Sequence, residues 1–237
     1  LQHRPIKEEH DTDFFVEDLW ISYGNLKPIL CGVDCKVAAG QIIAVIGKNG
    51  CGKSTFARCL CGLIKEKKGK VQFQGNKLGA KKRIGEIYLV MQDSTCQLFS
   101  DSVMGELILS GKMKKNSSYE FEEVLKELSL MDLKTRHPMS LSGGEKQRLT
   151  IAAGIIQNAD VMILDEPTSG LDYKNMQRVK AVMEKLRNKG KRVFVITHDY
   201  ELLLSTCDRV LEIEGGKISK DYPVDSNHLH HIRQFFL

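Results

Sequence analysis

The segment around residue 47 leaves the chain little freedom in how it folds. Residues 41–46 (QIIAVI) are a continuous apolar run, as expected of a strand buried on both faces. Residues 47–54 (GKNGCGKS) follow at once and match the pattern G-x-x-x-x-G-K-[ST]. Residues 53–63 then read as a helix that ends near Gly62. This order of strand, glycine-rich turn and helix predicts a loop whose backbone N–H groups surround phosphate oxygens.

The side chains of this loop suit a nucleoside triphosphate with its magnesium ion. Lys53 is placed to set its ammonium against the β- and γ-phosphates, and Ser54 to ligate Mg²⁺ through its hydroxyl. The glycines let the backbone approach the anion closely, because they carry no side chain. The predicted nucleotide-binding residues here are Gly47, Lys48, Asn49, Gly50, Cys51, Gly52, Lys53, Ser54 and Thr55.

A second apolar strand, at 161–164 (VMIL), ends in the two carboxylates of Asp165 and Glu166. Asp165 is placed to hold Mg²⁺, directly or through water, and Glu166 to polarise an attacking water. Many strands end in acidic residues, so the pattern alone is weak. Beside a phosphate loop it becomes strong, because phosphoryl transfer needs both a metal and a positioned nucleophile. The pair therefore predicts a hydrolytic site.

Strands and helices alternate along most of the chain. Short β-rich runs with turn signals occupy 14–46, and residues 93–158 are mainly helical in character. Further strands are expected at 71–73, 87–91, 161–164 and 193–196, and a further helix at 173–188. The alternation predicts an α/β fold with a mostly parallel sheet and helices on both faces, and the helical stretch reads as an inserted lobe. With the loop at 47–54 this is a P-loop NTPase core.

These segments suggest one domain between two tails. Residues 1–13 are polar and charged, so a linker or disordered tail is expected there. The domain is expected over 14–225, with the core and β subdomain at 14–92 and 159–225 and the helical lobe at 93–158. Residues 226–237 read as a solvated tail. Its histidines lack nearby Cys or carboxylate partners at zinc-ligand spacing; they are His228, His230 and His231.

Composition excludes several classes of protein. Values of 42% hydrophobic and 27% charged residues argue against disorder and against a disulfide-dense miniprotein. The seven cysteines are irregularly spaced and are interpreted as reduced thiols. No apolar run approaches the roughly 18–20 residues of a membrane-spanning helix. The net charge of +5 is spread along the chain, and 81–83 (KKR) and 112–115 (KMKK) read as solvated turns. No nucleic-acid partner is expected.

Residues 141–148 (LSGGEKQR) are the most distinctive motif of the chain. A Ser N-cap and two glycines open a helix here, which is typical of an ordinary helix cap and also of an anion site. The motif resembles the signature of the ATP-binding cassette (ABC) ATPases, and the resemblance extends from Phe14 to about Lys220. It implies the ABC ATPase fold, in which an antiparallel β subdomain and a helical lobe accompany the P-loop NTPase core. It also implies Mg²⁺-dependent hydrolysis of ATP, coupled to transport.

The same resemblance implies that two ATP molecules lie between two cassettes in a head-to-tail dimer. Ser142, Gly143 and Gly144 would then face the nucleotide held by the partner cassette. Asp172, within 169–172 (SGLD), would belong to the loop that joins the two ATP sites.

Roles for three more residues come from the resemblance. Tyr23, 24 positions before Gly47, would stack on adenine; the lesser alternative is a strand-end aromatic without that role. Gln92 would contact Mg²⁺ and the attacking water while sensing the transporter, and His198 would contact the γ-phosphate. The implied catalytic residues are Glu166, His198 and Gln92, and the implied metal ligands are Ser54, Gln92 and Asp165. Because each position carries the expected residue type, we expect a competent ATPase.

The spacing of the motifs separates the branches of this family. Only 49 residues lie between Gln92 and Ser142, too few for the coiled coils that chromosome-organising and DNA-repair relatives place there. Residues 97–99 (QLF) and 102–107 (SVMGEL) resemble the energy-coupling factor ATPases, which drive uptake of vitamins and transition-metal ions. A bacterial importer of this type is the implied system. A conventional importer or an exporter is the alternative, and a soluble ABC protein acting on ribosomes or DNA is a more distant one.

Partners and location also follow from the resemblance. It implies a second ABC ATPase domain, in a homodimer or heterodimer, and a transmembrane transporter subunit. It places the chain in the cytoplasm, peripheral on the inner face of the cell membrane. The linker-like start at Leu1 suggests the second half of a tandem protein with two cassettes.

Overall fold

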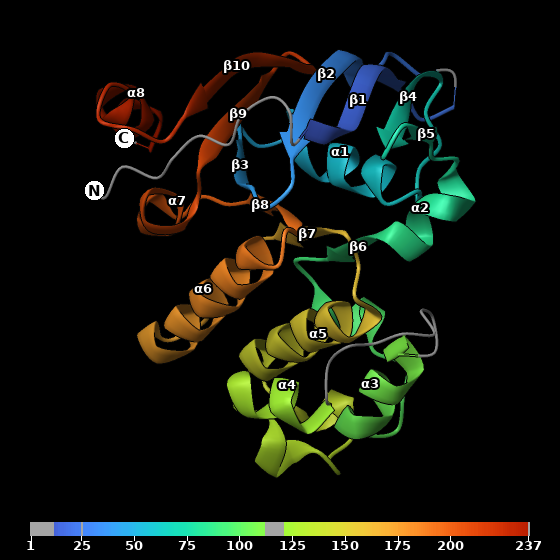
Figure 1. Ribbon diagram of the computed structural model, residues 1–237, viewed down its shortest axis with the longest axis vertical. Helices are drawn as coiled ribbons and strands as arrows, with labels where there is room; N and C mark the ends of the chain where they lie inside the picture. The colour runs from blue at the N-terminus through green and yellow to red at the C-terminus, as the bar shows by residue number, and fades with distance from the viewer. Residues whose placement is uncertain (1–11, 25, 112–120, 237) are drawn as a thin grey trace.

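The structure is a computed structural model that describes residues 12–24, 26–111 and 121–236. Its core is a six-stranded sheet in the order β10-β9-β3-β8-β7-β6 (Figure 1). All neighbouring strands pair in parallel except β10, which joins the edge antiparallel to β9. The strands are β3 (Ile42–Ile46), β6 (Ile87–Val90), β7 (Val161–Asp165), β8 (Arg192–Ile196), β9 (Arg209–Glu214) and β10 (Lys217–Pro223). The predicted mostly parallel sheet is confirmed.

An antiparallel sheet in the order β2-β1-β4-β5 lies beside this core (Figure 1). Its strands are β1 (Thr12–Ile21), β2 (Leu30–Ala38), β4 (Lys68–Phe73) and β5 (Asn76–Lys77). Between the two sheets lies α1 (Lys53–Leu60), and its Phe56 packs edge-on against Phe194 of β8. The predicted antiparallel β subdomain is therefore present as a layer over one face of the core sheet.

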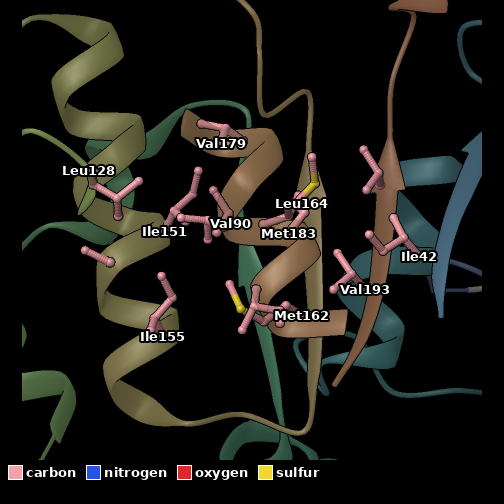
Figure 2. Packing of buried hydrophobic residues seen from close by; sticks show 14 of the residues in the cluster. Ile42, Val90, Leu128, Ile151, Ile155, Met162, Leu164, Val179, Met183 and Val193 are labelled. Carbon is pink, nitrogen blue, oxygen red and sulfur yellow. The ribbon is translucent and has the colours of Figure 1, made fainter. Parts of the chain in front are cut away.

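The two faces of the core sheet bury different clusters. Successive side chains of a strand point to opposite faces, so Ile43 and Val45 of β3 face the antiparallel sheet and α1. Ile42 and Ala44 face the other way, into the cluster shared with the helices. Figure 2 shows Ile42 and Val193 in this second cluster, together with side chains from the helices that cover this face of the sheet. Burial on both faces explains why these strands are apolar without alternation.

The chain between β6 and β7 forms a mainly helical lobe, at the bottom of Figure 1. It contains α3 (Val103–Gly111), α4 (Phe121–Glu127), α5 (Gly143–Gln157) and 3-10 turns at Ser94–Gln97, Met131–Leu133 and Pro138–Ser140. Its longest helix, α5, buries Ile151 and Ile155 against the core cluster (Figure 2). At Gly154 the helix approaches the sheet so closely that a Cβ would lie 2.6 Å from the Tyr88 ring. The lobe is therefore fastened to the core through α5.

Four other helices surround the core. They are α2 (Ala80–Glu86), α6 (Tyr173–Asn188), α7 (Tyr200–Thr206) and α8 (Leu229–Phe236). The predicted helix at 173–188 coincides with α6, whose Val179 and Met183 enter the cluster of Figure 2. None of the helices in the described part of the chain is long and apolar enough to span a membrane.

The structure changes the interpretation of both tails. Strand β1 begins at Thr12, and Asp13 forms an ion pair with Arg192, so the end of the expected 1–13 linker belongs to the sheet. Residues 1–11 lie outside the described residues. In the expected solvated tail, 226–237, residues 229–236 form α8. Ile232 of α8 is fully buried, because its apolar face packs against the core cluster.

One of the two basic runs, at 81–83, differs from the expectation of a solvated turn. Lys81 and Lys82 are exposed, but Arg83 is fully buried and all three lie within α2. The carboxylate of Glu66 and the Cys59 carbonyl bind the two terminal nitrogens of the Arg83 guanidinium, which makes its burial possible. The other run, 112–115, lies outside the described residues. No disulfide joins any of the seven cysteines, all of which lie within the described residues.

Candidate active site

The phosphate loop connects β3 to α1, as the sequence predicted, and folds around a buried ammonium. Lys53 is only 8% exposed, and its Nζ donates hydrogen bonds to the carbonyls of Gly47, at 2.6 Å, and Lys48, at 3.2 Å. A Cβ at Gly47 would lie 2.4 Å from the Ile213 carbonyl oxygen, so no side chain fits there. Two interactions therefore shape this loop: the close contact of Gly47 with β9 and the hydrogen bonds of Lys53.

The start of α1 presents unpaired N–H groups beside that ammonium. The first turn of a helix has no intrahelical acceptor for its N–H groups, and here Gly52 caps α1 without any side-chain hydrogen bond. Gly52 has φ 111°, and a Cβ would lie 2.7 Å from Leu30 Cδ2, so glycine is needed on both counts. Lysine charge and helix N–H groups together favour a bound anion.

A pair formed by a hydroxyl and a carboxylate adjoins the loop. Asp165 ends β7, and its carboxyl accepts a hydrogen bond from the Ser54 hydroxyl at the start of α1. Burial raises the pKa of Asp165, while the Ser54 hydroxyl and the charges of Arg58 and Lys53 work in the other direction. A hydroxyl and a carboxylate are hard oxygen donors of the type that Mg²⁺ prefers. The residues at this point therefore fit a magnesium ion.

The next residue, Glu166, faces His198. His198 Nε2 lies 3.7 Å from Glu166 Oε1, and the His198 backbone N–H donates to Glu166 Oε2 at 3.4 Å. Burial raises the pKa of Glu166, and the nearby His198 works against that rise. A carboxylate with a raised pKa is a stronger general base than an exposed one. The geometry places a base and an imidazole together, next to the phosphate loop.

The sheet topology explains why these residues meet. Because β3, β8, β7 and β6 are adjacent and parallel, their carboxyl ends share one edge of the sheet. The loop at 47–52, the carboxylates Asp165 and Glu166, and His198 all follow these strands. Gln92, which is exposed, comes two residues after β6 at the same edge. The four segments that sequence analysis assigned to one site are thus brought together.

The remaining predicted residues lie on exposed turns. Tyr23 is 42% exposed and follows β1, where its role toward adenine stays a prediction. Ser142 caps α5 in a capping box with Glu145, and Asp172 caps α6 by accepting a hydrogen bond from the Asn175 N–H at 2.7 Å. Ser142 and Asp172 can each cap a helix and still contact a nucleotide, because one side of each turn faces solvent.

The turn formed by Ser142, Gly143 and Gly144, here called the signature turn, contacts the loop at 169–172 of the same chain. A Cβ at Gly144 would lie 2.8 Å from Leu171 Cδ2, so the first turn of α5 packs closely on that loop. Leu171 in turn packs against the core cluster. The two segments expected to meet a second cassette are therefore supported by one another.

Sequence analysis missed structural roles in the segment after Gln92. The Gln97 side chain accepts a hydrogen bond from the Met91 N–H at 2.7 Å and donates one to the Leu89 carbonyl at 2.6 Å. It thereby pairs with backbone groups at the end of β6. Glu106 of α3 is buried and accepts from the N–H groups of Phe99 and Ser100 at 3.0 and 2.9 Å. The quoted motifs contained both residues, but only the fold shows which backbone groups they hold.

Replacing Gln97 with Ala should destabilise the protein, because both hydrogen bonds to β6 are lost. Two bonds at a net contribution of about 0.5–1.5 kcal/mol each predict a loss of about 1–3 kcal/mol in the free energy of unfolding. Urea unfolding followed by circular dichroism measures it. Cys96→Ala, at the exposed neighbouring position, is the matched control. Equal unfolding midpoints for the two variants would show that Gln97 does not brace this segment.

Comparison with known proteins adds sequence relatives. The protein family described as "ABC transporter" matches residues 30–169 of this chain. A Treponema denticola protein, provisionally named an ABC transporter ATP-binding protein, is 46% identical over 208 residues, which cover 88% of this chain and 42% of that protein. A Pyrococcus furiosus protein with the same kind of name is 35% identical over 210 residues, covering 86% of this chain and 80% of its own length. The chain thus spans less than half of the first relative.

Solved structures share the fold. The protein cbiO1 from Clostridium perfringens, part of the ABC transporter complex cbiONQ, is 26% identical with a TM-score of 0.79, covering 94% of this chain and 93% of that chain. A bacterial Atm1-family ABC exporter with ATP bound has a TM-score of 0.82 at 22% identity, covering 100% of this chain and 43% of that chain. At that identity the second likeness shows the fold alone.

Proposed function

Because this chain belongs to the ABC transporter family, whose ATPase domains hydrolyse ATP to power transport, we propose that it drives a bacterial importer of the energy-coupling factor type. The observation that carries hydrolysis is the pairing of Glu166 with His198 beside the phosphate loop. The importer type is supported by 97–99 (QLF) and by the likeness to cbiO1, itself part of a transporter complex. The transported substrate is a vitamin or a metal ion.

Binding of ATP is assigned to the loop and to Tyr23. Lys53 neutralises the β- and γ-phosphates while its loop carbonyl contacts keep the ammonium in place. Tyr23 stacks on the adenine. Ser54, Asp165 and Gln92 would hold Mg²⁺, which, when bound, offsets the negative charge of the phosphate oxygens. Thr55 and the other loop residues complete the site through their backbone N–H groups.

Hydrolysis is assigned to Glu166, His198 and Gln92. Glu166 accepts a proton from the attacking water, and His198 holds the γ-phosphate that this water attacks. Gln92 orients the water and reports on the membrane subunit. Positioning of this kind suits phosphoryl transfer, which depends mainly on orientation and charge stabilisation.

The rate of ATP hydrolysis should fall as the pH is lowered, because Glu166 must be ionised to act as a base. Burial raises the pKa of Glu166 above its ordinary value of 4.5, so the rate should begin to fall at a higher pH than for an exposed glutamate. A pH profile of kcat measures this acid limb. A Glu166→Gln variant should lack it, and the same limb in that variant would assign it to another group.

The proposed partners are a second ABC ATPase domain and a transmembrane subunit. Ser142, Gly143 and Gly144 of one cassette would meet ATP held by the other, with Asp172 in the loop between the sites. The second cassette is either a separate copy, identical or not, or part of the same polypeptide. More than half of the first relative's length lies outside the matched region, which leaves room for a second domain. The chain would act on the cytoplasmic face of the cell membrane.

The test is a pull-down from native membranes with the full-length protein as bait and an untagged strain as control. A shared transmembrane subunit recovered with a small substrate-binding membrane protein would support the energy-coupling factor type, and the small protein would identify the substrate. A conventional permease or an exporter subunit would overturn that type. Ribosomes or DNA without any membrane protein would overturn the role in transport.

A further inference from the structure

The backbone of Glu166 is held by two elements distant from it in sequence. Gln147, in the second turn of α5, is 4% exposed, and its Nε2 donates to the Glu166 carbonyl at 2.7 Å. On the other side, the Glu166 N–H donates to the Ile196 carbonyl of β8 at 2.9 Å. The polar backbone groups of this one residue are therefore fixed by the helical lobe and by the sheet.

Glu166 needs such restraint because of its conformation. Its φ is 52°, in the left-handed region that residues with a side chain seldom occupy. Such conformations are strained and persist where surrounding contacts determine them. The Ser169 N–H also donates to the Glu166 carbonyl, but at 3.2 Å and from within the same turn. Gln147 is thus the closer donor and comes from a separate element.

The backbone angle decides where the carboxylate lies. Rotation about the backbone of Glu166 redirects its Cα–Cβ bond, and with it both carboxylate oxygens. Those oxygens stand at 3.4 and 3.7 Å from the backbone nitrogen and Nε2 of His198. A displacement of about 1 Å in a reacting group can lower a rate by about 100-fold, so a contact that holds this angle also holds the reaction geometry.

We propose that Gln147 is a positioning residue for hydrolysis, which ties the orientation of α5 to the general base. The inference rests on the proposed role of Glu166. Since α5 begins at the signature turn, a movement of that turn toward a second cassette carries Gln147 with it and acts directly on the Glu166 backbone. The contact of Gly144 with Leu171 ties the following loop to the same helix. Closure of the signature turn would then set the base in place.

A buried glutamine could serve stability alone, and α5 offers a matched control for that role. Gln157, at the other end of the helix, is 2% exposed, and its Nε2 donates to the Ile84 carbonyl at 3.1 Å. It has the same side chain, helix, burial and type of acceptor as Gln147, but it does not contact Glu166. Gln→Met at each position keeps the length of the side chain and removes the donor.

The experiment compares Gln147→Met with Gln157→Met in the full-length protein, purified with the subunits that accompany it. The rate to compare is the part of ATP hydrolysis that a Glu166→Gln substitution abolishes. We expect Gln147→Met to lower its kcat by about 10- to 100-fold with the KM for ATP nearly unchanged. Gln157→Met should keep the parent kcat, although both variants lower the melting temperature. Equal kcat values in the two variants would overturn the inference.

A double variant tests whether Gln147 acts through Glu166. When Glu166 is already Gln, adding Gln147→Met should cause no further loss of the residual rate; a further loss of 10-fold or more would overturn the inference. If Gln147→Met does not fold, Gln147→Asn removes the contact by shortening the side chain, and the same results are expected. A Glu166→Gln protein as fast as the parent would instead refute the proposed function.

Discussion

A Glu166→Gln substitution is expected to slow ATP hydrolysis by about 10²- to 10⁴-fold, the usual contribution of a general base. Nucleotide binding should survive, because the amide has the shape of the carboxylate and the phosphate loop is built from other residues. Lys53 keeps its contacts with the loop carbonyls whichever group stands at position 166. Phosphate release measures the rate, and binding of a fluorescent ATP analogue measures the affinity.

A matched control for this variant is Glu201→Gln. Glu201 is exposed in the first turn of α7, three residues after His198, so its substitution removes the same charge close to the site. It should leave the rate near that of the parent. Hydrolysis by Glu166→Gln at the parent rate would refute Glu166 as the general base. Loss of ATP binding in the same variant would show that the carboxylate shapes the site.

An Arg83→Ala substitution is expected to be the most destabilising change in the β subdomain region. The fully buried guanidinium of Arg83 forms an ion pair with Glu66 and donates to the Cys59 carbonyl at 2.7 Å. Removing it leaves Glu66, whose side chain is 13% exposed, without its cationic partner. Loss of one member of a buried pair costs about 3–5 kcal/mol. Urea unfolding measures the cost, with the exposed neighbour Lys82→Ala as control.

The cost of Arg83→Ala should also depend on pH. Burial works to raise the pKa of Glu66, but the Arg83 hydrogen bond and charge outweigh it, and the pKa lies below its ordinary value of 4.5. A lowered pKa in the folded state adds stability above the ordinary pKa and loses it as the pH falls through the lowered one. The stability difference between parent and variant should therefore narrow in acid. A constant difference would show that the charge of Glu66 plays no part.

Several local elements could be predicted because their signals lie within a few residues of each other. The phosphate loop needs only an apolar strand, glycines and a helix start in succession, and residues 47–54 provide that order. The helix predicted at 173–188 has the bounds of α6, since its polar cap, apolar spacing and closing Gly190 are all local. The shared edge at which the parallel strands place these residues follows from the strand order that the structure shows.

Other features depend on partners far along the chain. Arg83 looked like part of a solvated basic turn, and its burial follows from Glu66 and Cys59 meeting it only in the folded state. The histidine-containing tail forms α8, whose Ile232 is buried in the core cluster and whose Phe236 ring lies 5.7 Å between centroids from that of Tyr200. Charge and polarity along the sequence favour exposure in both cases, and a tertiary partner reverses that preference.

The sequence by itself thus predicts the type of reaction, while the positions of the reacting groups depend on the tertiary structure. Residue types such as Lys53, Asp165 and Glu166, in their motifs, predict phosphoryl transfer. No periodicity or motif shows that Gln147 reaches the Glu166 carbonyl or that Glu166 adopts a positive φ. Those features arise when a helix of the lobe packs against the end of β7, and only the packed fold brings the two groups within hydrogen-bond distance.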